Sequence, residues 1–393
     1  MKRYIFLFSL LMQFTLNASA QMQKQIDTTI NHTFRIIPIK KAELLKNVDM
    51  IANLQFANNS NFQNESYTGS NFAMNQFRFE IKGLVFDSTI FFRFRYRYTR
   101  DPIIQSVDNI SHAVDMAFIG INLSSKVSLA FGKMCADYGG YEFDANPINI
   151  YEYNDIVEYA DNFLSGAQVS WSPVKNHQFT FQVLNARTQS FTQLYDSIPG
   201  VTAAKFPAAF IGNWRGSFAH GIFSTFWSYS LITEASKRNV YYIALGNQLN
   251  LKKWLIQYDF KYMKDDIDRL TLVTSLIPKS YSPYAALNTS YFEHWLHIQF
   301  AFYPKWDISI IGMVDDAYWN GNPDPNRDNH IRTSWGVIPS LEYYPIKKLN
   351  LKFFISYVGR YYNYTAYAKT KFGLEYSTTG MIMIGFISPL VIL

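Results

Sequence analysis

Arginine occupies every second position in the segment FFRFRYRYTR, residues 91–100, at Arg93, Arg95 and Arg97. The residues between these arginines are aromatic. Because successive side chains of a β-strand point to opposite faces, a strand here would carry aromatic rings on one face and three guanidinium groups on the other. A guanidinium keeps its positive charge and donates two parallel hydrogen bonds to phosphate or carboxylate. The segment therefore predicts a surface that binds or guides anions.

The segment before it shows the same alternation. Arg78, Glu80 and Lys82 alternate with apolar residues, and Asp87-Ser88 predicts a tight turn that places the two charged faces side by side. Two further basic residues are expected near the ends of neighbouring strands. The predicted anion-guiding residues are Arg78, Lys82, Arg93, Arg95, Arg97, Arg100 and Lys133.

The strands that carry such faces must place one face in an apolar environment and the other in water. Aromatic rings favour burial or lipid, whereas adjacent guanidinium groups repel one another and require water or anions. A strand of a transmembrane barrel meets both demands, because its outer face contacts lipid and its inner face a wet lumen. For this segment alone, an edge strand of a soluble sandwich with a solvated basic face remains the alternative.

The N-terminus indicates export. Lys2 and Arg3 precede an apolar run over residues 5–16, and Ala18-Ser19-Ala20 forms a small-residue cleavage site. This pattern predicts a secretory signal peptide over residues 1–20. Residues 21–49 are polar and mixed and are expected to form a periplasmic lead-in, and residues 50–393 the barrel. No apolar run is long enough for a membrane-spanning helix, so a membrane protein must here be a β-barrel.

Segments of alternating polarity recur along the whole chain, and the connections between them alternate between short and long. Short periplasmic turns and long outer loops are typical of a bacterial outer-membrane barrel. The first outer loop is expected over residues 58–71, a polar stretch. The predicted fold is therefore a closed antiparallel transmembrane β-barrel of about sixteen strands, at residues 50–57, 72–86, 91–100, 113–123, 127–134, 163–171, 177–185, 208–215, 222–231, 241–250, 254–262, 294–302, 306–315, 333–344, 349–362 and 379–393.

Composition agrees with one continuous barrel. Aromatic residues make up 18% of the chain, and barrels place such residues in girdles at both membrane interfaces. The single cysteine excludes an internal disulfide and a cysteine-rich zinc site. The net charge of +6 is too small to argue for nucleic acid as a partner.

Carboxylates gather in the third outer segment, residues 135–162. Between Met134 and Phe163 there is no lysine or arginine. If this segment folds into the lumen, its acids are expected to face the basic wall and to create a transverse field, as in general porins. The sequence thus leaves open an anion-preferring pore and a weakly selective one. The predicted constriction residues are Asp137, Glu142, Asp144, Glu152, Asp155, Glu158 and Asp161.

Three stretches resemble the phosphate-selective porin O and P family in its Bacteroidetes form. They are FRFRYRYTRDPIIQSVDN (92–109), FGKMCADYGGYEFDANPINIYEYNDIVEYADNFLSG (131–166) and GFISPLVIL (385–393). The pair Gly132-Lys133, which ends a strand before the long third loop, is similar to the family pattern. The resemblance implies a sixteen-stranded outer-membrane pore, usually trimeric, whose arginines and lysines guide anions such as phosphate.

The expected function is therefore passive diffusion of small anionic or polar solutes across the bacterial outer membrane. Partners are expected to be outer-membrane lipid and lipopolysaccharide, two further copies in a homotrimer, and the barrel assembly machinery. A general or sugar porin, an outer-membrane enzyme and a non-conducting structural barrel remain the alternatives. The seven histidines show no metal-ligand spacing, and neither G-x-S-x-G nor H-E-x-x-H occurs, so no enzyme, metal or cofactor is expected.

Overall fold

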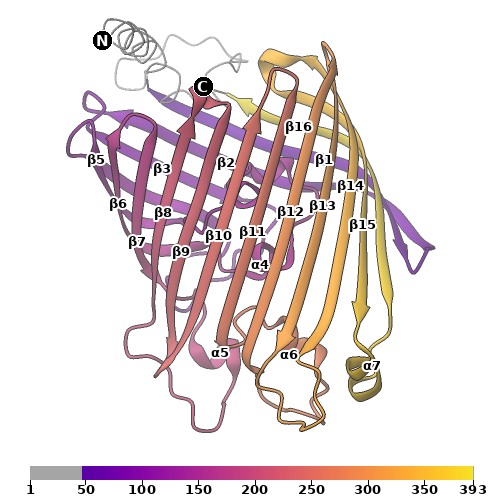
Figure 1. Ribbon diagram of the computed structural model, residues 1–393. Coiled ribbons are helices and arrows are strands. Elements are labelled where there is room, and N and C mark those ends of the chain that lie inside the picture. The colour runs from indigo at the N-terminus through magenta and orange to yellow at the C-terminus, as the bar shows by residue number, and fades with distance from the viewer. Residues whose placement is uncertain (1–46, 393) are drawn as a thin grey trace, which may run out of the picture.

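A computed structural model of the protein, described here for residues 47–392, forms a closed antiparallel β-barrel (Figure 1). Each strand pairs with its sequence neighbours, and β16 pairs with β1 to close the barrel. The predicted fold class is confirmed, and each of the sixteen predicted strands overlaps an observed one. The strands are β1 (Val48–Gln63), β2 (Ser66–Val85), β3 (Ile90–Arg97), β4 (Val114–Asn122), β5 (Val127–Cys135), β6 (Phe163–Val174), β7 (His177–Asn185), β8 (Ala208–Phe218), β9 (Phe223–Ala235), β10 (Arg238–Asn250), β11 (Trp254–Ile267), β12 (Leu287–Tyr303), β13 (Trp306–Trp319), β14 (His330–Ile346), β15 (Leu351–Tyr364) and β16 (Ser377–Val391).

The predicted signal peptide (1–20) lies outside the described residues. The same is true of the predicted lead-in (21–49) except for its last three residues, of which Val48 and Asp49 already belong to β1.

Alternation along each strand separates an apolar outer face from a polar lumen. On β7, Phe181 and Val183 are 59% and 44% exposed on the outer face, whereas Thr180 and Gln182 are buried toward the lumen. The same parity places Phe92, Phe94 and Tyr96 of β3 outside and its arginines inside, where Phe91 also lines the lumen. The predicted assignment of the two faces is therefore correct for this part of the wall.

Connections at one end of the barrel are short, with two to four residues each. Most connections at the other end are long, but two are not. Residues 58–71, predicted as an outer loop, instead extend β1 and β2 into a long hairpin whose turn is only Asn64 and Glu65. Both turn residues have positive φ, as a two-residue hairpin turn requires. The prediction of a loop was wrong because both faces of this hairpin are polar.

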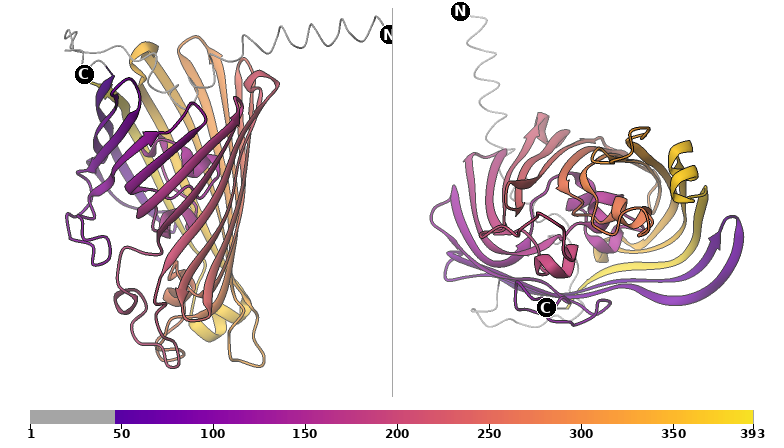
Figure 2. Two further views of the ribbon diagram at one scale, coloured as in Figure 1. Left: turned by 90° about the vertical axis from the view of Figure 1, so that its left-hand side faces the viewer. Right: turned by 90° about the horizontal axis from the view of Figure 1, so that it is seen from below.

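The wall is uneven in height (Figures 1 and 2). Strands β3, β4 and β5 have only eight or nine residues, whereas strands β9 to β16 have thirteen to seventeen. The outer connections carry the short helices α3 (Tyr141–Asp144), η3 (Pro147–Asn149), α4 (Asp155–Tyr159), α5 (Phe191–Tyr195), α6 (Leu272–Leu276) and α7 (Ala366–Phe372), and the short turns carry η4 (Ala219–Gly221) and η5 (Lys347–Leu349). None of the helices within residues 47–392 has the length and apolar character needed to cross a membrane.

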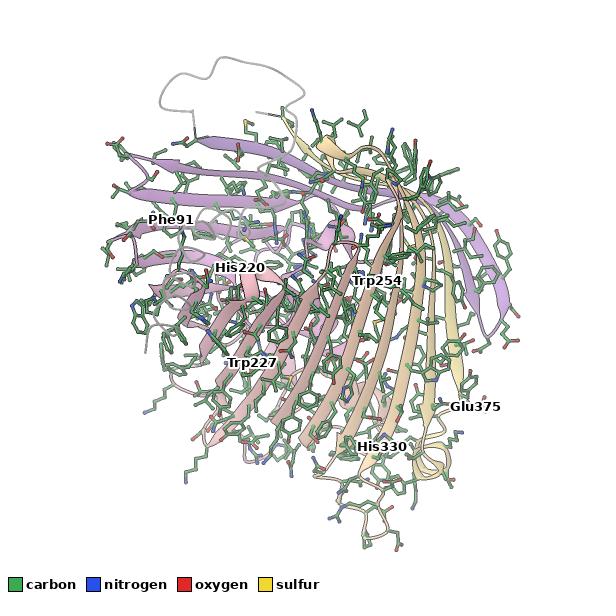
Figure 3. The ribbon with its side chains drawn as sticks, turned by 45° about the horizontal axis from the view of Figure 1, so that its top comes forward. Phe91, His220, Trp227, Trp254, His330 and Glu375 are labelled. Atoms are coloured by element: carbon green, nitrogen blue, oxygen red, sulfur yellow. The ribbon has the colours of Figure 1, made fainter. Side chains whose placement is uncertain are left out.

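Aromatic pairs lie toward both ends of the tall wall. Trp254 stacks on Phe300 with ring centroids 4.2 Å apart near the short turns, and Trp335 stacks on Tyr361 at 3.8 Å farther along the strands. Figure 3 shows Trp254 toward the short-turn end and His330 toward the opposite end. This arrangement is the aromatic girdle expected at two lipid–water interfaces.

Reversing polarity on one face of β7 should separate lipid-facing from lumen-facing positions. We expect Phe181→Arg to destabilise the folded barrel by about 2–4 kcal/mol, because it places a charge in lipid. Gln178→Arg, on the lumen face of the same strand, is the matched control and should fold normally. The measurement is the folded fraction in lipid vesicles over a urea titration. Equal stability of the two variants would contradict the assignment of the faces.

Candidate functional site

The lumen contains a polar cavity of about 1420 Å³. Ten lysines and arginines and eight aspartates and glutamates contribute to its lining. All seven predicted anion-guiding residues line it, and so do six of the seven predicted constriction acids. The exception is Glu142, whose side chain is completely buried. The cavity therefore brings together the two groups of residues that the sequence singled out.

The third outer loop, residues 136–162, folds into the barrel (Figure 2). The side chain of Gln55 on β1 donates a hydrogen bond to the carbonyl oxygen of Ile148 at 2.9 Å. On the other side, Asp259 of β11 accepts hydrogen bonds from the backbone N–H groups of Tyr141 and Glu142 at 2.9 and 2.8 Å. The loop thus reaches across the lumen and narrows it.

The basic residues of β2 and β3 form one continuous surface, here called the arginine ladder (Arg78, Lys82, Arg93, Arg95 and Arg97). Arg78 lies opposite Arg97 in the strand register, and Lys82 lies opposite Arg93. Like charges directly opposite one another are destabilising in a sheet unless other groups compensate them. The geometry therefore requires carboxylates or anions nearby.

Asp115 of β4 supplies one such carboxylate. Its Oδ1 lies 2.8 Å from Nη2 of Arg97, and its Oδ2 lies 3.2 Å from Nε of Arg95 and 3.6 Å from Nε of Arg78. Asp115 is completely buried, and Arg78 and Arg95 are only 2% and 5% exposed. One carboxylate is thus shared among three guanidinium groups.

The sequence did not single out Asp115, because simple alternation places it on the lipid face of β4. Val114 and Met116 both line the lumen, so Asp115 falls between two inward positions. The register between β3 and β4 shifts at Arg95 and Tyr96, which marks a β-bulge at Asp115. A bulge redirects a side chain that alternation would point elsewhere.

Two further basic residues of the site have local partners. Oε2 of Glu80 accepts a hydrogen bond from Nη2 of Arg93 at 3.1 Å. Lys133 lies 3.4 Å from Oδ2 of Asp108 and also donates to Gln105, both in the connection between β3 and β4. Arg93 keeps about a third of its side chain exposed to the lumen, so it is the most accessible of the ion-paired ladder arginines.

Most acids of the third loop pair with cations outside the ladder, in contrast to the expected transverse arrangement. Asp137 and Asp144 both bind Arg215 of β8, at 3.0 and 2.9 Å. Glu142 binds Lys261 of β11. The remaining pairs on the far wall are Glu152 with Arg360 at 3.5 Å, Asp155 with Arg360 at 3.4 Å, and Asp155 with Arg332. These five acids hold the loop against the wall.

Glu158 and Asp161 remain on the ladder side of the loop. Burial raises the pKa of Glu158, while Arg100 and Arg97 act to lower it. Asp161 lies 3.7 Å from Arg269 and accepts hydrogen bonds from the backbone and hydroxyl of Thr188. Burial also lowers the pKa of Arg100, and Arg97 adds to this effect. The transverse field between loop and ladder is therefore limited to these groups.

The far-wall cations were missed although the sequence carries a signal for them. On β11, Asp259 and Lys261 alternate with Tyr258, Phe260 and Tyr262, as the ladder arginines alternate with aromatic residues. Strict application of the same pattern to β11 identifies both charged residues as facing the lumen, where they are completely buried against the loop.

Comparisons with known proteins agree with this geometry. A model of the family phosphate-selective porin O and P matches residues 49–383. No match was found among functionally curated proteins.

Several solved structures share the fold at low sequence identity. The outer membrane channel DcaP of Acinetobacter baumannii is 9% identical, with a TM-score of 0.59 over 86% of this chain and 96% of that one. An anion-selective porin from Comamonas acidovorans is 8% identical, with a TM-score of 0.55 over 87% and 99%. OmpT of Vibrio cholerae, in its trimer form, is 10% identical, with a TM-score of 0.50 over 86% and 98%.

Removing one cation of the far wall should release the loop. Lys261 is completely buried between Glu142 of the loop and Glu293 of β12. Lys261→Met leaves both carboxylates without this partner, which costs about 3–5 kcal/mol for a buried pair. We expect a larger and noisier single-channel conductance in planar bilayers.

The matched control for this prediction is Lys264→Met, which changes an exposed lysine on the same strand. Its conductance should equal that of the unmodified protein. A Lys261→Met channel with unchanged conductance and noise would show that Lys261 does not hold the loop.

Proposed function

The chain belongs to the phosphate-selective porin O and P family of bacterial outer-membrane porins, and from this premise we propose that it favours small anions such as phosphate. Solutes cross by passive diffusion, and the arginine ladder guides them past the third outer loop. Membership of a porin family supports a channel rather than an enzyme.

The observation that carries this proposal is the incomplete charge compensation at Asp115. Three guanidinium groups, two of them buried, share one carboxylate, so positive charge remains at this point of the lumen wall. Nε and Nη1 of Arg78 have no hydrogen-bond acceptor among the described residues. A planar guanidinium with free donors is suited to an oxyanion.

Permeation requires that this attraction be shared among several weak positions. The cations lie in steps along two paired strands, with Arg100 and Lys133 beyond them. A row of positive groups between low-dielectric walls raises the local concentration of anions. Because Asp115, Glu80 and Asp108 partly neutralise five of these seven cations, an anion binds weakly enough to move on.

A weakly selective general porin is the second candidate. It is favoured by the near balance of charge in the lining, with ten basic and eight acidic residues. It is also favoured by uncharged polar side chains on the remaining wall, among them Gln178, Gln182, Gln257 and Gln299, which suit neutral solutes such as sugars. The two candidates differ in the sign and size of the reversal potential.

We infer the partners from the same premise. A porin of similar fold, OmpT of Vibrio cholerae, has been solved as a trimer, and we propose a homotrimer here. The apolar outer face is suited to contact with outer-membrane lipid and lipopolysaccharide, and the barrel assembly machinery is expected to insert the chain.

Neutralising Asp115 tests the anion preference. We expect Asp115→Asn to shift the zero-current potential in a tenfold salt gradient further toward the anion side, because the three arginines lose their shared countercharge. The measurement uses purified protein in a planar bilayer, first in chloride and then with phosphate added as a competitor. Glu65→Gln is the control, since it removes one carboxylate at the exposed β1–β2 turn.

The unmodified protein must itself show a potential of anion sign. A potential of cation sign would refute the anion preference, and a potential near zero in both proteins would favour the general porin.

Acid should strengthen the anion preference. Burial raises the pKa values of Asp137, Glu152 and Glu158, three carboxyls that line the lumen. As pH falls from neutral, these groups become protonated before ordinary carboxyls, which titrate near about 4.3. The lumen then loses negative charge, so the zero-current potential should move toward the anion side. Glu158→Gln should reduce this pH response, and a response equal to that of the unmodified protein would contradict the assignment.

A further inference from the structure

The β1–β2 hairpin leaves one strand edge without a partner. β2 has twenty residues, but β3 pairs with it only from Arg78 to Val85. The last backbone contact on that side is the hydrogen bond from the N–H of Tyr98 to the carbonyl oxygen of Phe77, at 2.9 Å. Within the described part of the chain, residues 66–76 therefore pair only with β1.

The outer part of this hairpin, residues 58–72, is here called the arm. Figure 2 shows the arm curving away from the ring of the barrel, and Figure 1 shows that it ends near the middle of the tall strands, well short of the connections that carry α5, α6 and α7. The arm therefore projects sideways from the barrel wall, and does not cover the pore.

The side chains of the arm differ from those of the lipid-facing wall beside it. Asn58 and Ser60 lie in register with Ile384 and Ile382 of β16. Directly paired residues of a sheet share a face, and both isoleucines are exposed on the outside, Ile384 by 56%. Amides and hydroxyls at the level of lipid-facing isoleucines are suited to contact with protein rather than with hydrocarbon.

The arm is built as a rigid element. The ring of Phe72 stacks on that of Phe56 with centroids 6.1 Å apart, and Phe62 packs on Tyr67 at 5.7 Å. Asn64 is tied to Thr378 of β16 by two hydrogen bonds of 2.9 Å. A rigid arm loses little conformational entropy when it binds a partner.

The exposed edge lacks two of the usual protections, although register shifts mark bulges of β2 at Thr68 and Asn75. Free strand edges are commonly blocked by lysine or proline, and residues 66–77 contain neither. Phe72 and Tyr67 are 75% and 61% exposed, and Figure 3 shows side chains of the hairpin projecting beyond the rest of the wall. Open sheet edges do not face hydrocarbon, because their peptide groups would lack partners.

We propose that the arm docks on the barrel wall of a second copy of this chain. Its occupant must lie at the depth of the membrane, because the arm ends beside the transmembrane strands. A second copy meets this condition and carries an identical arm, so repeating the contact can close a ring. The inference rests on the proposed homotrimer and names the segment that holds it together.

Substitution of the two exposed aromatic residues tests this contact. The full-length protein carrying Tyr67→Gln and Phe72→Gln should shift from trimer to monomer in native mass spectrometry, with the conductance of each pore unchanged. Tyr229→Gln is the matched control, because Tyr229 is 51% exposed on the outer face of β9. A double variant that stays as trimeric as this control overturns the proposal.

The oligomeric state of the unmodified protein distinguishes failure of the proposed trimer from failure of the proposed anion preference. If it is itself monomeric, the homotrimer and the docking of the arm both fail, while the zero-current potential of the same preparation still tests the anion preference.

A photocrosslinking benzophenone residue at Ser70, in cells, identifies what the arm touches. We expect an adduct of twice the mass of the chain. An adduct with a different outer-membrane protein overturns the proposal.

Discussion

A peptide group in lipid must find its hydrogen-bond partner within the protein, and this constraint organises the whole barrel. It requires closure of β16 onto β1, and it makes each strand divide its side chains between hydrocarbon and water. The charges of the ladder are consequently directed to the lumen, where they meet the third outer loop. The same constraint applies to the unpaired edge of β2, because peptide groups at this depth need hydrogen-bond partners from protein.

Much of this arrangement was predictable, because alternation is a local signal. The inward positions of Arg78, Arg93 and Arg95 follow from parity alone. The inward position of Asp115 could not be predicted from alternation, because a bulge interrupts the alternation of β4. The strands of the arm could not be predicted either, because a strand that is polar on both faces shows no alternation of apolar and polar residues. The position of the third loop depends on pairs such as Asp155 with Arg360, more than two hundred residues apart, which a single sequence does not reveal.

The buried ion pairs of the loop specify its position more than they stabilise the barrel. Taking both charges out of water offsets most of their attraction, so such pairs add little net stability, whereas a displaced loop would leave unpaired charges in the wall. Lys261, Arg332 and Arg360 each pair with a carboxylate of the loop, and Lys261 and Arg360 also pair with a carboxylate of the wall. A displaced loop would remove the loop partner of all three cations. The constriction is therefore well defined although the loop contains only short helices.

The ladder differs from these ion pairs, because its guanidinium groups outnumber the carboxylates that neutralise them. Asp115 lies where a bulge brings it within reach of three guanidinium groups, and two further carboxylates would be needed at this point to close the charge balance. With one carboxylate, the folded wall retains a local excess of positive charge that mobile anions from solution must screen. In the proposed function, this excess of positive charge attracts anions, and the anions in turn reduce the repulsion within the wall. Under the same proposal, passing anions supply the countercharge that Asp115 alone does not provide.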